Sequence, residues 1–200
     1  MELIDNINKT LASDLKETIK PGSKISIPAS CFSIYAYQEL KEQLENIESL
    51  QFIFTSPTFT TEKAKKEKRE FYIPKLNRER SLYGTEFEVK LRNELSQKAI
   101  AKECAEWIRS KVTFKSNATN ENMMGFINVD ESNYMPIQGF STSDLGCEKG
   151  NNAYNMVQKT EAPFSMAYIN LFNQLWKDKE KLQEVTDVVI ENTTARIIQT

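Results

Sequence analysis

Glu88 and Lys90 are the residues whose types and spacing most directly suggest metal-dependent chemistry. In the run 86–90 they form an apolar-Glu-x-Lys string, in which a glutamate can bind Mg²⁺ and a lysine can orient the attacking water of a nuclease. Such a site also needs a second carboxylate shortly upstream, and no aspartate occurs between Asp14 and Asp130. The surrounding apolar spacing predicts a helix, so we interpret both residues as a charged helix surface. A Mg²⁺-dependent nuclease is the weakest of the alternatives.

The composition excludes several common mechanisms, because the 200 residues contain no histidine. A Ser-His-Asp triad, a Cys-His pair, a His-ligated metal and a phosphohistidine intermediate are all impossible. The six glycines form neither a G-x-G-x-x-G nor a Walker pattern, so these nucleotide-binding loops are excluded too. Cys31, Cys104 and Cys147 form no C-x-x-C pair. We therefore expect buried, reduced thiols in the cytoplasm, with no metal site and no cofactor.

One segment has a strong charge asymmetry. Residues 62–80 hold eight basic against four acidic side chains, a net charge of +4. Because the whole chain has a formal charge of −2, the remainder carries −6. The segment is either a solvated loop or a flexible element that contacts phosphates. The residues of this segment that are candidates for binding nucleic acid are Lys63, Lys65, Lys66, Lys68 and Arg69.

The apolar spacing of the first third of the chain predicts an α/β fold. Leucine and isoleucine recur every four residues over 3–19 and predict a first helix, which Pro21-Gly22 ends. A strand is expected over 24–29, then a helix capped by Ser33, then a second strand over 50–55. Short connections between these elements favour a right-handed parallel βαβ unit.

The remaining chain predicts one long helix, three short strands and two final helices. The long helix covers about 85–110, and the final two cover 164–177 and 180–198. Strands are expected at 111–115, 125–129 and 134–140, the last two joined as a hairpin through the turn 130–133, and residues 144–152 are expected as a loop. The expected fold is a mixed β-sheet flanked by helices, with a C-terminal helical pair.

The stretch 111–152 resembles the second part of a phospholipase D-like module. In that family an H-x-K-x-x-x-x-D strand is followed by a strand that ends in a Gly-Ser-x-Asn-like loop. With Met123 at the histidine position, Gly125 stands at the lysine position and Asp130 matches the aspartate. A start at Met124 would instead place Phe126 and Glu131 there. In the loop, Gly139 and the hydroxyl residues Ser141 and Thr142 are retained.

The whole chain is similar to the phospholipase D-like N-terminal domain that precedes the motor in bacterial superfamily 2 helicases of the Swi/Snf-like type. The residues that carry this similarity lie at 30–37, 52–59, 69–74, 81–87 and 112–117. The resemblance implies a phospholipase D-like α/β domain over 1–160. Residues 161–200 would then be helices that lead into a helicase motor absent from this chain.

The family reaction needs a histidine nucleophile, so the resemblance implies a catalytically degenerate domain without a cofactor. We expect a nucleic-acid-recognition or docking module of an ATP-dependent helicase or translocase. Its partners would be DNA and the motor domain in cis, without a membrane. Besides the basic segment, the candidate contacts are Lys115, Ser116, Asn117, Ser141 and Thr142. The alternative is a protein-interaction or dimerisation module that does not bind nucleic acid.

Overall fold

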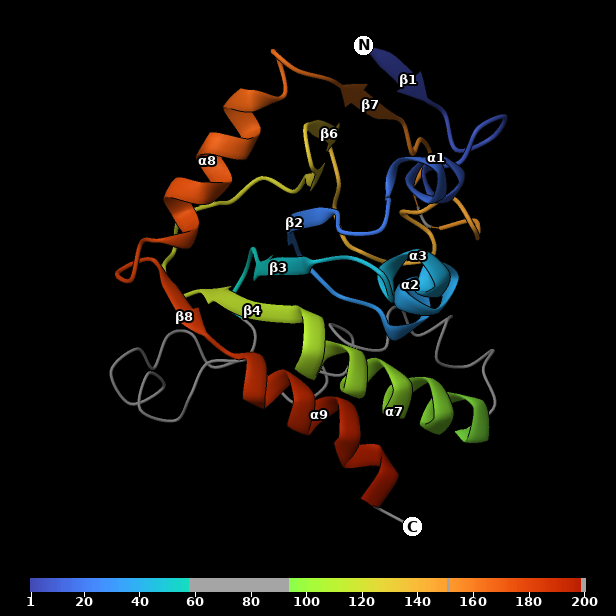
Figure 1. Cartoon of the computed structure of the whole chain (residues 1–200), viewed down its shortest axis with the longest axis vertical. Coiled ribbons are helices and arrows are strands. Elements are labelled where there is room, and N and C mark those ends of the chain that lie inside the picture. Colours follow the sequence, from blue (N-terminus) through green and yellow to red (C-terminus); the bar gives the residue numbers. More distant parts are fainter. Residues whose placement is uncertain (58–93, 151, 199–200) are drawn as a thin grey trace.

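The computed structural model describes residues 1–57, 94–150 and 152–198, and a mixed sheet of eight strands lies at its centre (Figure 1). In spatial order the strands are β1 (Glu2–Ile4), β7 (Val157–Thr160), β6 (Ser132–Met135), β5 (Ile127–Val129), β2 (Lys24–Ala29), β3 (Ser49–Phe54), β4 (Val112–Asn117) and β8 (Leu182–Glu184). The strands β2, β3 and β4 are parallel, and all other neighbours are antiparallel. The expected α/β class with a mixed, helix-flanked sheet is confirmed.

The described helices cover both faces of this sheet. The larger face packs against α1 (Leu11–Thr18), α2 (Ile34–Glu39), α3 (Lys41–Leu44), α7 (Glu94–Lys111) and α9 (Thr186–Ile198). Of the described helices, only α8 (Met166–Trp176) packs against the opposite face (Figure 1). The sheet therefore has a thick, apolar side and a thinly covered side.

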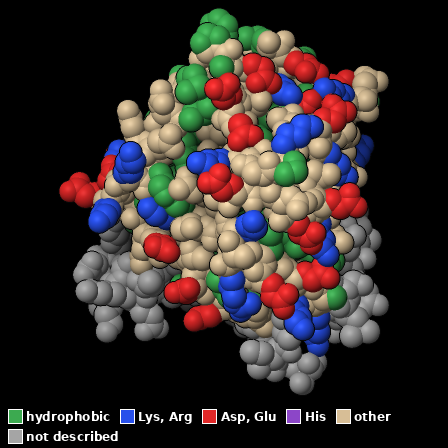
Figure 2. Space-filling model, viewed as in Figure 1, with side chains coloured by type: hydrophobic (Ala, Val, Ile, Leu, Met, Phe, Trp, Pro, Cys, Tyr) green, Lys and Arg blue, Asp and Glu red, His purple; other side chains and the backbone are tan. Residues whose placement is uncertain are grey.

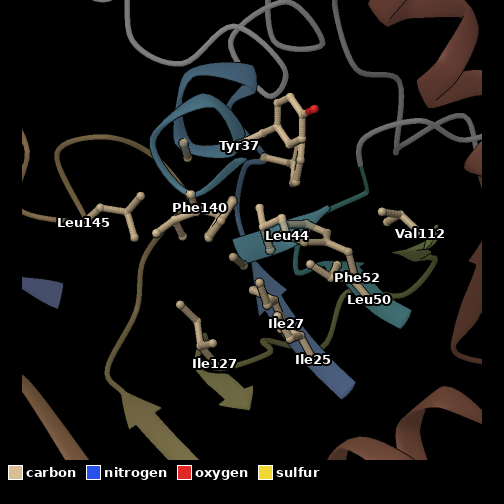
Figure 3. Close-up of a cluster of buried hydrophobic side chains, with 14 of the residues drawn as sticks. Ile25, Ile27, Tyr37, Leu44, Leu50, Phe52, Val112, Ile127, Phe140 and Leu145 are labelled. Carbon is tan, nitrogen blue, oxygen red and sulfur yellow. The ribbon is translucent and has the colours of Figure 1, made fainter. Parts of the chain in front are cut away.

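The main core lies between the sheet and the larger helical layer (Figure 3). Alternate residues of each parallel strand point into it, as Ile25 and Ile27 do from β2 and Phe52 does from β3. Side chains that alternate in this way bury one face of a strand and leave the other free for different contacts. Trp107 of α7 joins the same core, and its indole Nε1 donates a hydrogen bond to the carbonyl of Leu44 at 2.8 Å.

The predicted βαβ unit is confirmed as a parallel pair. The strand β2 has the predicted bounds, and β3 begins one residue before its prediction. The hydroxyl of Ser33 caps α2 by accepting a hydrogen bond from the backbone N–H of Tyr35 at 3.2 Å. The predicted helix divides at Leu40 into α2 and α3.

The predicted helix over 3–19 is wrong in its first half. The carboxylate of Asp5 accepts hydrogen bonds from the backbone N–H groups of Ile7 and Asn8, and Asn6 adopts a left-handed φ of 56°. This turn separates β1 from α1, which starts after the cap residue Thr10. Aspartate and asparagine favour such turns because their side chains bind nearby backbone groups and compete with the helix.

The predicted hairpin is confirmed, and its second strand is shorter than expected. The strands β5 and β6 pair antiparallel around Asp130 and Glu131, and β6 ends at Met135, before Pro136. The predicted helix over 85–110 corresponds to α7 from Glu94 onward. Residues 85–93 of the prediction lie outside the described part of the chain. β4 continues two residues beyond its predicted end at 115.

Two C-terminal helices are present as α8 and α9, but they do not form the predicted pair: α8 packs against one face of the sheet and α9 against the other. Residues 182–184, predicted as part of the last helix, instead form β8 at the edge of the same sheet. The strands β1 and β7 were not predicted either. Short strands of three or four residues are recognised by their pairing partners more than by their own periodicity.

The three cysteines differ in how far they are buried. Cys104 is fully buried, as predicted, but Cys147 is exposed and Cys31 is half-buried. Lysines, arginines and acidic residues are mixed over much of the face shown in Figure 2. None of the helices in the described ranges is long and apolar enough to span a bilayer.

Candidate functional site

The carboxyl ends of the parallel strands meet at one edge of the sheet, where α/β folds commonly bind ligands. Ala29, Phe54 and Ser116 are aligned across β2, β3 and β4 at this edge. Asn117 follows Ser116, and its side-chain Nδ2 donates to the carbonyls of Thr55 at 2.8 Å and Glu121 at 2.9 Å. The buried Ser116 and Asn117 thus bind the protein's own loops at this edge.

Lys115 lies on the opposite face of β4 from Ser116. Its Nζ donates to the carbonyl of Trp176 at 2.7 Å and lies 4.3 Å from the centre of the Trp176 ring. A lysine commonly satisfies the last carbonyls of a helix in this way, and an indole face attracts its charge. Lys115 therefore fastens the end of α8 to the sheet, and it does not share a face with the hydroxyl of Ser116.

The small-residue loop after β6 packs on the loop that follows β2. The N–H of Ser30 donates to Gln138 at 2.9 Å, the N–H of Phe140 donates to Cys31 at 2.9 Å, and the N–H of Ser33 donates to Phe140 at 2.8 Å. These backbone hydrogen bonds bring the candidate residues Ser141 and Thr142 to the same sheet edge as Ser116 and Asn117.

The hydroxyls of that loop face carboxylates. Ser141 is buried, and its Oγ donates to Asp144 Oδ2 at 2.6 Å. Thr142 is fully buried and donates to Glu148 Oε2 at 3.3 Å. An anionic ligand would have to compete with these carboxylates for the hydroxyl protons and would also be repelled by their charge.

Met123 and Gly125, the positions that align with the family's histidine and lysine, hold no reactive group. Met123 packs against the second apolar cluster, which includes Phe126 and Phe172. A Cβ at Gly125 would lie 1.8 Å from the carbonyl oxygen of Ile137. Any side chain at residue 125 would require the backbone to move, so the structure leaves no room for a lysine there.

Asp130 lies at the other end of β2. Its carboxylate accepts hydrogen bonds from Ser23 Oγ at 2.7 Å and from the N–H of Lys24 at 2.9 Å. These bonds hold the β5–β6 turn, in which Asp130 has a left-handed φ of 51°, against the start of β2. Met123 and Asp130 therefore do not line one common cleft.

Several predicted residues lie outside the described part of the chain. They are Lys63, Lys65, Lys66, Lys68 and Arg69 of the basic segment, together with Glu88 and Lys90. Among the described residues, no three histidine, cysteine, aspartate or glutamate side chains come together as a metal site.

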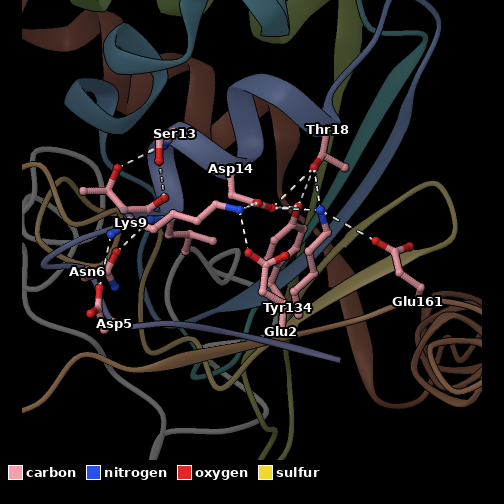
Figure 4. Close-up of polar contacts among 12 residues, drawn as sticks. Glu2, Asp5, Asn6, Lys9, Ser13, Asp14, Thr18, Tyr134 and Glu161 are labelled. Carbon is pink, nitrogen blue, oxygen red and sulfur yellow. Dashed lines mark hydrogen bonds and ion pairs between the residues drawn. The ribbon is translucent and has the colours of Figure 1, made fainter.

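The sequence did not reveal a polar cluster that is centred on Asp14 of α1 (Figure 4). Its carboxylate lies 2.6 Å from Lys9 Nζ and 3.0 Å from Lys159 Nζ, and it accepts a 2.6 Å hydrogen bond from the Tyr134 hydroxyl. The Thr18 hydroxyl oxygen lies 2.8 Å from the same phenolic oxygen. The one available signal was an aspartate beside the apolar stripe of α1, next to Leu15.

Charge and burial act against each other in this cluster. Burial raises the pKa of Asp14, but hydrogen bonds from Lys9, Tyr134 and Lys159 outweigh it and hold that pKa at about 2. Burial and the bond to Asp14 raise the pKa of Tyr134 above its usual range. At neutral pH Asp14 is therefore an anion and Tyr134 keeps its proton, which suits a structural role better than proton transfer.

Comparison with known proteins adds no relative to this geometry: the chain matches no protein-family model, and no curated protein matches it.

Proposed function

We propose that this chain is a non-enzymatic recognition or docking module, a phospholipase D-like domain whose chemistry has been lost. One observation carries the proposal: a Cβ at Gly125 would lie 1.8 Å from the carbonyl oxygen of Ile137, so a catalytic lysine cannot occupy the motif's second position. The side chain at the first position, Met123, packs into an apolar cluster and cannot attack phosphorus.

The arrangement around these two positions supports the resemblance on which the proposal rests. The hairpin β5–β6 turns at Asp130, the motif residue that is retained, and the loop that carries Gly139 and Ser141 follows it directly. In the family pattern these two segments also follow one another. The proposed domain would sit ahead of an ATP-dependent helicase or translocase motor in cis.

Nucleic acid is the partner class that we propose for the basic segment 62–80. Its net charge of +4 contrasts with −6 on the rest of the chain, so attraction to phosphates would be concentrated there. The described candidates Lys115, Ser116, Asn117, Ser141 and Thr142 are all engaged within the protein, which argues that they contribute little to such binding.

The test measures binding of the full chain to fluorescent single-stranded and duplex DNA by anisotropy over a range of salt concentrations. The test variant replaces Lys63, Lys65, Lys66 and Lys68 by Glu. The control replaces Lys16, Lys20, Lys102 and Lys149 by Glu, because these exposed lysines match its charge change on other surfaces.

We expect weak binding by the wild type that falls as salt rises, and loss of this salt dependence in the test variant alone. An isotherm that the test variant leaves unchanged would contradict the nucleic-acid proposal. Equal loss in the control would mean that net charge alone drives the association.

A further inference from the structure

The helix α8 is an uncharged surface on a charged molecule. Residues 162–176 contain no charged side chain, although charged residues make up 27% of the chain. Phe172 is the helix residue buried against the sheet, whereas Phe164, Met166 and Leu171 are 76%, 36% and 39% exposed. In Figure 2, hydrophobic side chains gather at the top of the molecule, where Figure 1 places the connection from β7 to α8.

The outward side of α8 combines small, amide and apolar side chains. Ala167, Asn170 and Gln174 are exposed along it, with Leu171 beside them. Because residues three or four apart lie on one side of a helix, these four form one continuous strip. Such a strip can be buried without leaving an unpaired charge, and its amides can hydrogen-bond to one another.

Opposite charges stand at the two ends of this uncharged stretch. Glu161 precedes it, with a side chain 54% exposed, and the exposed Lys177 follows it. Glu161 accepts a 2.7 Å hydrogen bond from Ser132 and lies 3.6 Å from Lys159, so its position is already restrained. If two copies of α8 lay side by side in opposite directions, each Glu161 would approach the Lys177 of the other copy.

An uncharged strip with an acidic residue at one end and a basic residue at the other is complementary to a second copy of itself. A second copy of the chain is therefore the partner that this charge pattern favours. Two copies with the same net negative charge repel each other, so they meet most easily where the surface is uncharged. Antiparallel alignment also places each helix N-terminus beside the C-terminus of its neighbour, which is the favourable order for helix dipoles. A two-fold axis satisfies both ends at once, since every contact then occurs twice.

We propose that α8 is a self-association surface, on which two copies of this chain pair antiparallel about a two-fold axis near Asn170. The strip Ala167–Asn170–Leu171–Gln174 forms the centre of the contact. Phe164 is buried at each end, beside the ion pair between Glu161 and Lys177 of the two copies. This association does not depend on nucleic-acid binding.

The experiment is sedimentation equilibrium of the full chain without nucleic acid. We expect the wild type to show a mass between monomer and dimer that rises with concentration, within about 10–100 μM. Asn170→Arg places two cations against each other at the axis and should leave only monomer. Asn120→Arg, the same change at an exposed loop position after β4, should leave the equilibrium unchanged.

A charge exchange tests the orientation of the two helices. Lys177→Glu should raise the dissociation constant about tenfold, because the axis repeats the change in two contacts. Glu161→Lys together with Lys177→Glu should restore the wild-type value if the pairing is antiparallel. Circular dichroism checks that each variant is folded.

Three outcomes would overturn the proposal: a wild type that stays monomeric, a dimer that Asn170→Arg leaves intact, or a double variant no tighter than Lys177→Glu. A failure here is distinct from a failure of the nucleic-acid proposal, because no DNA is present and none of the basic residues of 62–80 is changed.

Discussion

At the scale of single residues, Asp14 joins several segments of the described part of the chain. It is 2% exposed and binds groups from the turn before α1, from β6 and from β7. A buried carboxylate is tolerated only when cations and hydrogen-bond donors surround it, and here two lysines and a tyrosine do so. The cluster joins residues 9 and 159, which are distant in the sequence.

Asp14→Asn should lower the free energy of unfolding at neutral pH by about 3 kcal/mol, because it leaves the half-buried Lys159 without its full counter-charge. Urea denaturation measures this loss. Asp187→Asn, at an exposed position in the first turn of α9, is the control and should cost about 0.5 kcal/mol or less. Equal losses of stability in the two variants would contradict the role of Asp14 in joining α1 to β6 and β7.

The same carboxylate should contribute to stability against acid. Because folding lowers the pKa of Asp14 from 3.8 to about 2, its contribution is complete above about pH 4 and is lost as the pH falls through about 2. The difference in Tm between the wild type and Asp14→Asn should therefore shrink over this range. A difference that stays constant from pH 4 to pH 2 would show that Asp14 titrates normally.

Gly125 tests the close approach of two backbone segments. Gly125→Ala should destabilise the protein by about 3 kcal/mol or more, because its Cβ would overlap the carbonyl of Ile137. Gly22→Ala is the matched control: Gly22 has a φ of +83° and open space around it, so the cost should be about 1 kcal/mol. Thermal unfolding compares the stability of the two variants. A Gly125→Ala variant as stable as the wild type would contradict the conclusion that residue 125 has no room for a lysine.

At the scale of elements, α8 depends on a small number of side chains. Phe172 is buried, Tyr168 contacts Phe126 edge to face at 5.7 Å, and Lys115 binds the carbonyl and the ring of Trp176. The last turn of a helix leaves carbonyls without partners, so a cation there stabilises the helix end. Lys115 thus acts on the attachment of α8 to the sheet.

Lys115→Gln should cost about 1–2 kcal/mol and speed amide hydrogen exchange across α8. Lys102→Gln, at an exposed position on α7, should leave exchange in α8 unchanged. If Lys115→Gln instead weakened DNA binding and left amide exchange in α8 unchanged, Lys115 would contact phosphate, as the sequence predicts.

At the scale of the whole molecule, the absence of histidine and the distribution of charge define what the chain can do. No residue can act as a histidine nucleophile, and a net charge of −6 outside the basic segment disfavours phosphate binding there. The described fold encloses a substantial apolar core on one side of the sheet and carries a lightly attached helix on the other.

The whole chain should therefore hydrolyse neither bis(4-nitrophenyl) phosphate nor oligonucleotides faster than buffer, with or without Mg²⁺. A colorimetric assay and a gel assay measure this, and Glu88→Gln should change nothing. EDTA-sensitive cleavage that disappears in Glu88→Gln would instead support the nuclease hypothesis for Glu88 and Lys90.

The parts of the fold that were predicted correctly depend on local signals. β2 and β3 combine alternating apolar residues with a Ser33 cap, and the β5–β6 hairpin is marked by a turn. The errors lie where long-range pairing decides: β1 pairs with β7 across more than 150 residues, and β8 pairs with β4. Segments of three residues carry too little periodicity to reveal such partners.

The candidate site divides in the same way. The sequence named Asn117 and Ser141 as candidate contacts without placing them together, and it could not show that Lys115 faces the other side or that Asp130 lies at the far end of β2. The Asp14 cluster was invisible, because its members come from four separate segments.

By itself, the sequence determined the α/β class and excluded every imidazole-dependent mechanism, since both follow from residue types and local spacing. Only the tertiary structure decided that Gly125 has no space for a side chain, that Asp14 is buried between two lysines and that α8 remains exposed. These features arise from packing between segments far apart in the chain, and such packing depends on the three-dimensional approach of atoms rather than on any local pattern.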